Sequence, residues 1–365
     1  MGPLGCIDRT FTVLVVNTGS TSTKIAVFCG CKLLFSDNIQ HPPDELARYA
    51  RIPEQLEYRK GVIQRSLASS GVALEQIDAI ISRGGALKPV PGGVYLIDEA
   101  VVDDLLNRPS TEHAANLAAP IARAFADSLG VPAYFADPIS VDEYEPLARL
   151  SGLPEISRVS KLHALSIRST AAKAAASLGK ALEEANLVVA HLGSGISISP
   201  VKAGKMVDAN GADDEGPFSP ERSGSVPMSD LVTLCYSGQY DEGELIHLLT
   251  HGSGLFAHLG TTDAREVEKM ILAGNTRASD VEQAMAYQIS KEIGAMATVL
   301  CGRVDAIVLT GGLAAWDRLV GHITERCCFI APVITYPGEN EMEALASSVM
   351  RVLAGEEKAR VYASV

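Results

Sequence analysis

The sequence predicts an α/β protein made of two duplicated domains. Strands and helices alternate along the chain, which is typical of layered α/β folds. The 365 residues exceed the length of one ordinary domain, roughly 100–200 residues. Two pairs of segments also recur in the same order in the two halves. We therefore expect an N-terminal domain of residues 1–150 plus about 340–365, and a second domain of residues 151–339.

The internal repeat consists of two short matches. Val16-Asn17-Thr18-Gly19-Ser20 parallels Ala190-His191-Leu192-Gly193-Ser194, and each segment lies between two expected strands. The segment from Asp78 to Gly85 parallels the segment from Asp305 to Gly312, with identity at Asp, Ala, Ile and both glycines and without a gap. A duplicated α/β protein forms a cleft between its halves, and ligands favour such interfaces. The repeat therefore predicts a ligand cleft.

The elements follow from short apolar runs, helical periodicity and the turn residues between them. We expect strands at Phe11–Val16, Thr23–Cys29, Lys32–Asn38, Ile77–Ser82, Ala133–Ala136, Leu187–Ala190, Ile196–Ser199, Lys205–Ala209 and Asp305–Thr310. We expect helices at Pro53–Ser69, Asp98–Leu106, Glu112–Leu129, Val281–Leu300 and Glu341–Ala354.

Composition narrows the class of protein. The net charge is −13 and no Lys/Arg run occurs, which argues against a nucleic-acid partner. The seven cysteines lack zinc-like spacing and are expected to be reduced, as in a cytosol. No apolar run approaches the roughly 18 residues of a membrane span, and the N-terminus does not read as a signal peptide. These features predict a cytoplasmic protein without a membrane partner.

The first motif is Asn17-Thr18-Gly19-Ser20-Thr21-Ser22-Thr23-Lys24. Small residues let backbone N–H groups approach phosphate oxygens, and hydroxyls add donors. A P-loop needs a helix after its glycine-rich turn, whereas the apolar run after Lys24 continues as a strand. The motif therefore favours a phosphate-binding hairpin, with a Ser/Thr-rich turn that binds nothing as the alternative.

Two further motifs bear on ligand binding. Gly311-Gly312 follows a buried strand and either lets a ligand approach the backbone or forms a tight connection to a helix. The segment from Glu215 to Gly224 holds two prolines, and these restrict the loop that carries Arg222. A fixed guanidinium suits a carboxylate or phosphate. Arg222 and Arg83 could each instead be surface ion-pair residues.

These motifs together resemble the acetate kinase family, and within it the butyrate kinase branch, from about Val13 to Ala354. The carriers are Asn17 to Lys24, Ser82-Arg83-Gly84-Gly85-Ala86-Leu87-Lys88-Pro89, Glu112-His113-Ala114-Ala115-Asn116-Leu117, Ala136-Asp137-Pro138, His163-Ala164-Leu165, Asp214 to Gly224 and Leu309-Thr310-Gly311-Gly312. The resemblance implies two duplicated actin-like (RNase H-like) domains with a nucleotide cleft between them. The N-terminal domain would form the acid and phosphate side, closed by the C-terminal helix, and the second the nucleotide side.

The resemblance also implies roles for individual residues. Catalytic or cleft-lining positions would be Arg222, Arg83, His163, His113, Asp137 and His191. Nucleotide and phosphate contacts would come from Asn17, Gly19, Ser20, Ser22, Lys24, Gly193, Ser194, Gly195, Asp263, Gly311 and Gly312. Mg²⁺ would be held at Asn17 and Glu341, with ATP or ADP as co-substrate. Two positions depart from the branch pattern: Ser347 stands where Glu is usual, and Ala315-Trp316 where a Tyr-Asn pair is commoner.

The implied reaction is reversible transfer of the γ-phosphoryl group of ATP to butyrate or a similar short-chain fatty acid, by a homo-oligomer. A carboxylic acid with a pKa of about 4–5 is ionised at pH 7 and needs no general base. It needs cations that offset repulsion between anions, such as Lys24, Arg83, Arg222 and Mg²⁺. Alternatives are a kinase for acetate, propionate or a branched acid, a sugar kinase using Asp137 as base, and an actin-like nucleotide-binding protein that is not an enzyme.

Overall fold

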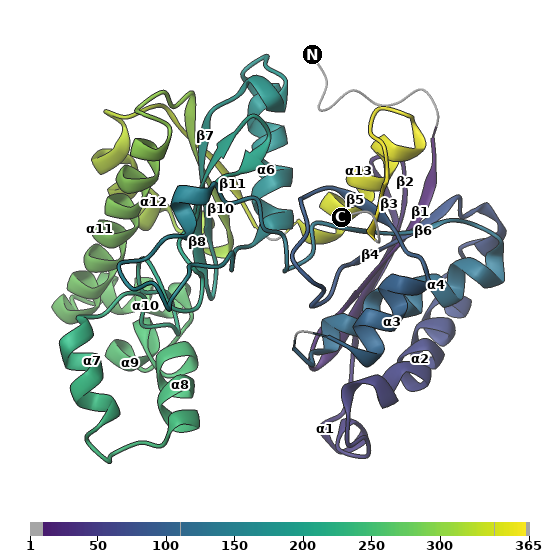
Figure 1. The fold of residues 1–365 in the computed structure, drawn as a ribbon, viewed down its shortest axis with the longest axis horizontal. Coiled ribbons are helices and arrows are strands. Elements are labelled where there is room, and N and C mark those ends of the chain that lie inside the picture. Colours follow the sequence, from purple (N-terminus) through teal and green to yellow (C-terminus); the bar gives the residue numbers. More distant parts are fainter. Residues whose placement is uncertain (1–9, 110, 339, 363–365) are drawn as a thin grey trace. The chain divides into compact units, whose positions relative to one another are not determined.

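The computed structural model describes residues 10–109, 111–338 and 340–362. The chain divides into two compact units, each with its own sheet and helices (Figure 1). The first unit contains the described residues up to Asp142 together with those from Asn340 onward, and the second those from Glu143 to Gly338. Among the described residues, no helix is long and apolar enough to cross a membrane.

The first unit is built on a seven-stranded sheet with strand order β12-β5-β6-β4-β1-β2-β3. Strands β1 to β3 form an antiparallel meander, whereas β4 and β6 run parallel to β1. The bounds are β1 Thr12–Thr18, β2 Ser22–Cys29, β3 Lys32–Gln40, β4 Ala79–Arg83, β5 Val94–Leu96, β6 Ala133–Ala136 and β12 Arg360–Val361.

Helices cover both faces of this sheet, because β1 and β4 are apolar on both sides. One face of β1, with Leu14 and Val16, packs in the core cluster with α2, α3 and α4. Helix α13 also packs on β1, β4 and β6, and Figure 1 shows it on the opposite side. The bounds are α1 Pro43–Leu46, η1 Ile52–Gln55, α2 Leu56–Ser69, η2 Leu74–Gln76, α3 Glu99–Asn107, η3 Ala114–Leu117, α4 Ala118–Leu129 and α13 Glu341–Leu353.

The second unit is built on a five-stranded sheet with strand order β11-β10-β7-β8-β9. Helix α6 packs on β7 and β10, and the core cluster joins the other face of these strands to α11 and α12. Helices α7 to α10 form an excursion between β9 and α11 (Figure 1). The bounds are α5 Pro146–Arg149, α6 Ala164–Ser177, η4 Leu182–Glu184, β7 Leu187–Leu192, β8 Ile196–Lys202, β9 Lys205–Met206, α7 Met228–Cys235, α8 Glu242–His251, α9 Gly254–Leu259, α10 Ala264–Leu272, α11 Thr276–Val299, β10 Ala306–Gly311, η5 Gly312–Ala315, α12 Asp317–Cys327 and β11 Val333–Pro337.

The two units share their central topology, in agreement with the predicted duplicated α/β fold. In each, an antiparallel hairpin (β1–β2 or β7–β8) lies beside a strand parallel to its first member (β4 or β10). The repeated aspartates make the same contacts. The Asp78 carboxylate accepts from Thr12 N at 2.7 Å, and that of Asp305 accepts from Asn186 N at 2.9 Å. In both cases the aspartate N–H donates back to the same partner's carbonyl at 2.8 Å.

Several predicted elements differ from the structure in their bounds, and three of these differences have a local physical cause. The helix expected over Pro53–Ser69 is divided, because the 3₁₀ turn η1, with Pro53 in its first turn, precedes α2. The helix expected from Glu112 begins only after His113, whose extended backbone and ring nitrogen cap η3. The strand expected over Lys205–Ala209 ends at Met206, because Asp208 is drawn into a hydrogen bond with Arg158. The helices α1, α5 to α10 and α12 and the strands β5, β11 and β12 were not predicted.

The two adjacent glycines after β10 should tolerate substitution very differently. Gly311 has φ +91°, and a Cβ there would lie 2.4 Å from Leu192 O. A non-glycine residue in this conformation costs about 1–3 kcal/mol before the clash is counted. We expect Gly311→Ala to lower the melting temperature of the ligand-free protein, as measured by calorimetry. Gly312→Ala is the control, since no atom lies within 4 Å of the added Cβ. Equal effects of the two changes would contradict this reading of the turn.

Candidate active site

The first hairpin carries the predicted phosphate-binding residues on one face. Strand β2 follows the turn directly, so the prediction of a strand rather than a helix after the turn is confirmed. Asn17 pairs across the hairpin with Lys24, so the two side chains leave the same face, together with Ser22. Lys24 and Ser20 are exposed, whereas Asn17 is buried. The hairpin thus presents a cation and hydroxyls beside one buried amide.

The strand ends of the first unit bring Asn17, Arg83 and Glu341 together. Asn17 Nδ2 donates to Glu341 Oε2 at 2.9 Å, and Arg83 Nη1 lies 3.2 Å from Glu341 Oε1. Glu341 is the first residue of α13 and Arg83 is the last of β4. Both charged side chains keep about a quarter of their surface exposed, 26% and 27%. The three predicted residues therefore form one polar cluster, with hard oxygen donors beside a cation.

His113 and Asp137 occupy defined positions in the same unit. His113 Nδ1 accepts from Ala115 N at 3.1 Å. Burial, then the charges of Arg83 and Arg59, lower the pKa of His113, so the ring is neutral at pH 7. Asp137 is 4% exposed, has φ +39°, and accepts from Gly93 N at 2.8 Å. Its carboxylate thus supports the backbone near Gly93.

The second hairpin places two predicted histidines side by side. The rings of His163 and His191 stack with centroids 4.1 Å apart. A serine hydroxyl orients each ring: Ser197 Oγ lies 2.9 Å from His163 Nδ1, and Ser166 Oγ lies 2.9 Å from His191 Nδ1. His191 is the last residue but one of β7, and His163 directly precedes α6, so folding joins two segments that are separate in sequence.

Arg222 lies directly against the second hairpin turn. A Cβ on Gly195 would lie 2.2 Å from Arg222 Nη1, so the guanidinium occupies the space that any side chain would need. Arg222 Nη1 donates to Ala212 O at 2.8 Å and pairs with Asp213 at 2.7 Å. Arg222 Nε is buried, with no hydrogen-bond partner among the described residues. The predicted cation is therefore prepositioned beside the turn.

The loop that carries Arg222 is attached to the same turn. Ser219 Oγ donates to Ser194 O, and Arg222 N donates back to Ser219 Oγ at 3.1 Å. Ser219 N in turn donates to Arg222 O at 3.1 Å. These contacts place the guanidinium and the turn in one rigid substructure.

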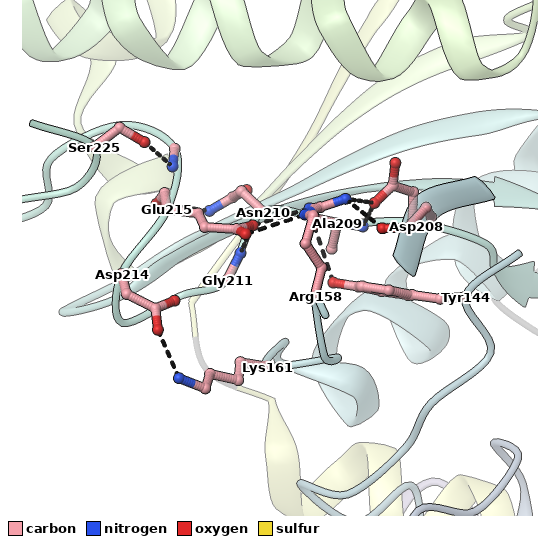
Figure 2. Close-up of polar contacts among 12 residues, drawn as sticks. Tyr144, Arg158, Lys161, Asp208, Ala209, Asn210, Gly211, Asp214, Glu215 and Ser225 are labelled. Atoms are coloured by element: carbon pink, nitrogen blue, oxygen red, sulfur yellow. Dashed lines mark hydrogen bonds and ion pairs between the residues drawn. The ribbon is translucent and has the colours of Figure 1, made fainter. Parts of the chain in front are cut away.

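A network centred on Arg158 holds the segment from Asp208 to Glu215 (Figure 2). Arg222 contacts the same segment at Ala212 and Asp213. Arg158 pairs with Glu215 at 2.9 Å and Asp208 at 2.9 Å, and donates to Ala209 O at 2.6 Å. The hydrogen bond to Glu215 raises the pKa of Arg158 further, against the effect of burial. Burial alone would raise the pKa of Glu215, but the hydrogen bond from Arg158 brings it below its usual value. Both groups therefore stay charged.

A cavity of about 540 Å³ opens beside the second hairpin turn. Its walls come from the turn, the start of α10 and the turn after β10. The lining includes Gly193, Ser194, Asp263, Glu268, Gly312 and Trp316. Hydrogen bonds from the Arg265 side chain and backbone lower the pKa of Asp263 to about 2, so its carboxylate is ionised and held by its own helix. The cavity is large enough for a nucleoside.

Trp316 is a fixed part of this cavity wall. Its indole Nε1 donates to Glu268 Oε2 at 2.7 Å. Arg318 binds both oxygens of the same carboxylate, at 2.9 and 3.0 Å. Both oxygens of Glu268 are therefore hydrogen-bonded, and Trp316 is part of the cavity lining.

The comparisons with known proteins agree with this geometry. Residues 156–332 match the model of the acetokinase family. A protein from Listeria innocua described as a probable butyrate kinase is 46% identical over 353 residues, covering 96% of this chain and 99% of that protein. A probable butyrate kinase 2 from Caldanaerobacter subterraneus is also 46% identical, with the same coverage of 96% and 99%.

The chain belongs to the acetokinase family.

The fold comparison points the same way. The crystal structure of Porphyromonas gingivalis acetate kinase superposes with a TM-score of 0.75 at 21% identity, covering 93% of this chain and 99% of that one. The fold is therefore the actin-like fold of acetokinase relatives, as predicted.

Two arginines with several polar partners, Arg158 and Arg59, were not identified from the sequence of this acetokinase family member. Arg158 stands in a segment without helical or strand periodicity, and its partners lie 50 and 57 residues away. Arg59 could have been identified from the sequence, because it occupies the apolar stripe of α2 with Leu56, Ile63 and Leu67. A charged residue in a buried stripe indicates a specific partner or role.

Across residues 10–109, 111–338 and 340–362, no metal-binding cluster of acidic, histidine or cysteine side chains is evident. Within the described ranges, no group of three or more such side chains could hold an ion. Mg²⁺ commonly uses only one or two carboxylates together with substrate phosphates and water. Asn17 and Glu341, side by side, have the donor chemistry that such an ion needs.

Removing Arg158 should loosen the segment from Asp208 to Glu215. Arg158→Met leaves Asp208 and Glu215 without their cation, and loss of one partner of a largely buried pair costs roughly 2–4 kcal/mol. We expect a lower midpoint of denaturant unfolding, together with a fall in kcat. Arg303→Met, at an exposed position of the same unit, is the control. A variant of unchanged stability would show that the network does not hold this segment.

Proposed function

We propose that this protein is an ATP-dependent carboxylate kinase that phosphorylates butyrate or a similar short-chain fatty acid, reversibly, to give acyl phosphate and ADP. The observation that carries the proposal is the Arg222 guanidinium held against the glycine turn of β7–β8, beside two stacked histidines. The probable butyrate kinases at 46% identity over 96% of the chain support the choice of acid.

The chemistry follows from charge. The acid is an anion at pH 7, so its attack on a phosphoryl group requires cations rather than a base. Arg222 and Arg83 supply guanidinium groups, and Lys24 supplies an ammonium group on the first hairpin. His113 is neutral and can donate one hydrogen bond without adding charge. In this proposal the Asp137 carboxylate fixes the backbone by accepting a hydrogen bond from Gly93 N, and it does not act as a base.

We assign the nucleotide base to the cavity beside Gly312, and the phosphate contacts to the glycine turn Gly193 to Gly195 and to the first-hairpin residues from Asn17 to Lys24. Turns of this kind bind phosphates through backbone N–H groups. Asn17 and Glu341 would hold Mg²⁺, which supplies charge neutralisation of the phosphates when bound. We further propose that the protein works in the cytoplasm as a homo-oligomer.

Substrate preference is the first test. We expect a higher kcat/KM for butyrate or isobutyrate than for acetate, in a hydroxamate assay with C2–C6 acids, ATP and Mg²⁺. One methylene in an apolar pocket is worth about 1–3 kcal/mol, so the preference should be measurable. Glucose is included in the panel. A preference for acetate would overturn the choice of acid, and activity on the sugar alone would overturn the reaction class.

Replacement of Arg222 by lysine tests its proposed role. Arg222→Lys keeps the charge but loses the planar fork, so contacts to the carboxylate and phosphoryl oxygens are lost. We expect kcat and kcat/KM to fall on the order of 100- to 1,000-fold. ATP affinity, measured by calorimetry, should change little. Arg303→Lys, at an exposed site, should behave like wild type, whereas near-normal kcat in Arg222→Lys would make Arg222 an ion-pair residue only.

A further inference from the structure

Arg59 is a completely buried arginine beneath the first hairpin turn. Its side chain is 0% exposed. Arg59 Nη1 donates to Gly19 O at 2.9 Å and Ser22 O at 3.3 Å, and Nη2 donates to Ser20 O at 3.1 Å. The guanidinium thus holds three of the four carbonyls of the turn. The fourth, Thr21 O, accepts from His41 N at 2.8 Å.

All acceptors of Arg59 are electrically neutral. Besides the carbonyls, they are Thr23 Oγ1 at 3.1 Å and Gln55 Oε1, which accepts from Nε at 3.0 Å and Nη2 at 2.9 Å. Among the residues that the structure describes, no carboxylate pairs with Arg59. Burying an unpaired charge is costly, so its retention indicates a compensating anion or a specific role.

The positive charge of Arg59 contributes to the lowered pKa of two neighbouring histidines. Burial, then the positive charge of Arg59, lowers the pKa of His41 to about 4. The same charge contributes, after burial and Arg83, to the lowered pKa of His113. The positive potential therefore extends from α2 to residues on both sides of the hairpin turn.

The hairpin has an inner and an outer face. Thr18 and Thr23 pair across the strands, and Thr23 contacts Arg59, so this pair faces inward. Asn17, Ser22 and Lys24 leave the opposite face. The peptide bonds are trans, and a trans peptide directs its N–H away from its C=O. With Gly19 O and Ser20 O drawn toward Arg59, the N–H groups of Ser20 and Thr21 point to the outer side.

We propose that Arg59 is a positioning residue for phosphate binding: it holds the turn carbonyls inward and supplies the unpaired positive charge that a phosphate bound on the outer face compensates. The identity of that anion as a nucleotide phosphate rests on the proposed function. The effect on the anion has two parts, the outward N–H groups and the long-range charge, and the two can be separated by mutation.

Gln55→Glu tests the charge without removing the clamp. The new carboxylate keeps the oxygen that accepts from Arg59 but neutralises its charge. We expect ATP binding with Mg²⁺, measured by calorimetry, to weaken by about 10- to 100-fold while the unfolding midpoint stays the same or rises. Adenosine binding should not change. Gln64→Glu adds the same charge at an exposed site on the same helix, and should leave ATP affinity near that of wild type.

Arg59→Met and Arg59→Lys provide a second measurement. Lysine keeps the charge without the fork, so we expect Arg59→Lys to retain more ATP affinity and more kcat/KM for ATP than Arg59→Met. Unchanged ATP affinity in Gln55→Glu, or equal losses in the lysine and methionine variants, would overturn the proposal. Failure of the proposed function looks different: wild type would then form no acyl phosphate with any acid in the panel, whatever the ATP affinities of these variants.

Discussion

Close approach of polar groups to the backbone at the end of β7 is the constraint on which the second unit depends. Gly311 is folded against Leu192 O, and Arg222 rests where a side chain on Gly195 would be. These contacts bring β10, the Arg222 loop and the hairpin turn to one place. A larger residue at either glycine would displace the guanidinium or the strand, so small residues here are required by geometry rather than by flexibility.

The duplication supplied the same hairpin twice, and the two copies use an arginine in opposite ways. Matching aspartates, Asp78 and Asp305, fix the same strand junction in both units. In the first, Arg59 braces the turn from its buried side through carbonyl oxygens. In the second, Arg222 covers the turn and pairs with Asp213. Arg59 is completely buried and cannot exchange its partners, whereas Arg222, whose partner Asp213 is half exposed, can.

The sequence predicted the elements with strong local signals and missed those that depend on distant contacts. An apolar run after Lys24 was enough to distinguish a hairpin from a P-loop, and the repeated Asp-to-Gly-Gly segments were enough for the duplicated fold. The stacking of His163 on His191 could not be predicted without knowing how α6 meets β7. Arg158 finds its carboxylates 50 and 57 residues away. Helices α7 to α10 contribute few residues to the core: α7 buries none, and α8 and α10 bury only Leu245 and Val267.

A protein of net charge −13 must bind anions through local cations. The partner that each cation has in the ligand-free protein determines how easily an incoming anion can bind it. Arg83 pairs with Glu341, and Arg222 pairs with Asp213, whose side chain is 48% exposed. An ion pair with an exposed partner is weak, so an incoming anion with better geometry can replace Asp213 at little cost. Among the described residues, Arg59 has no such carboxylate to displace, and its charge acts on the turn before any ligand arrives. The first unit therefore holds one positive charge that no described carboxylate pairs with, whereas Arg222 in the second unit is held by an exposed acid.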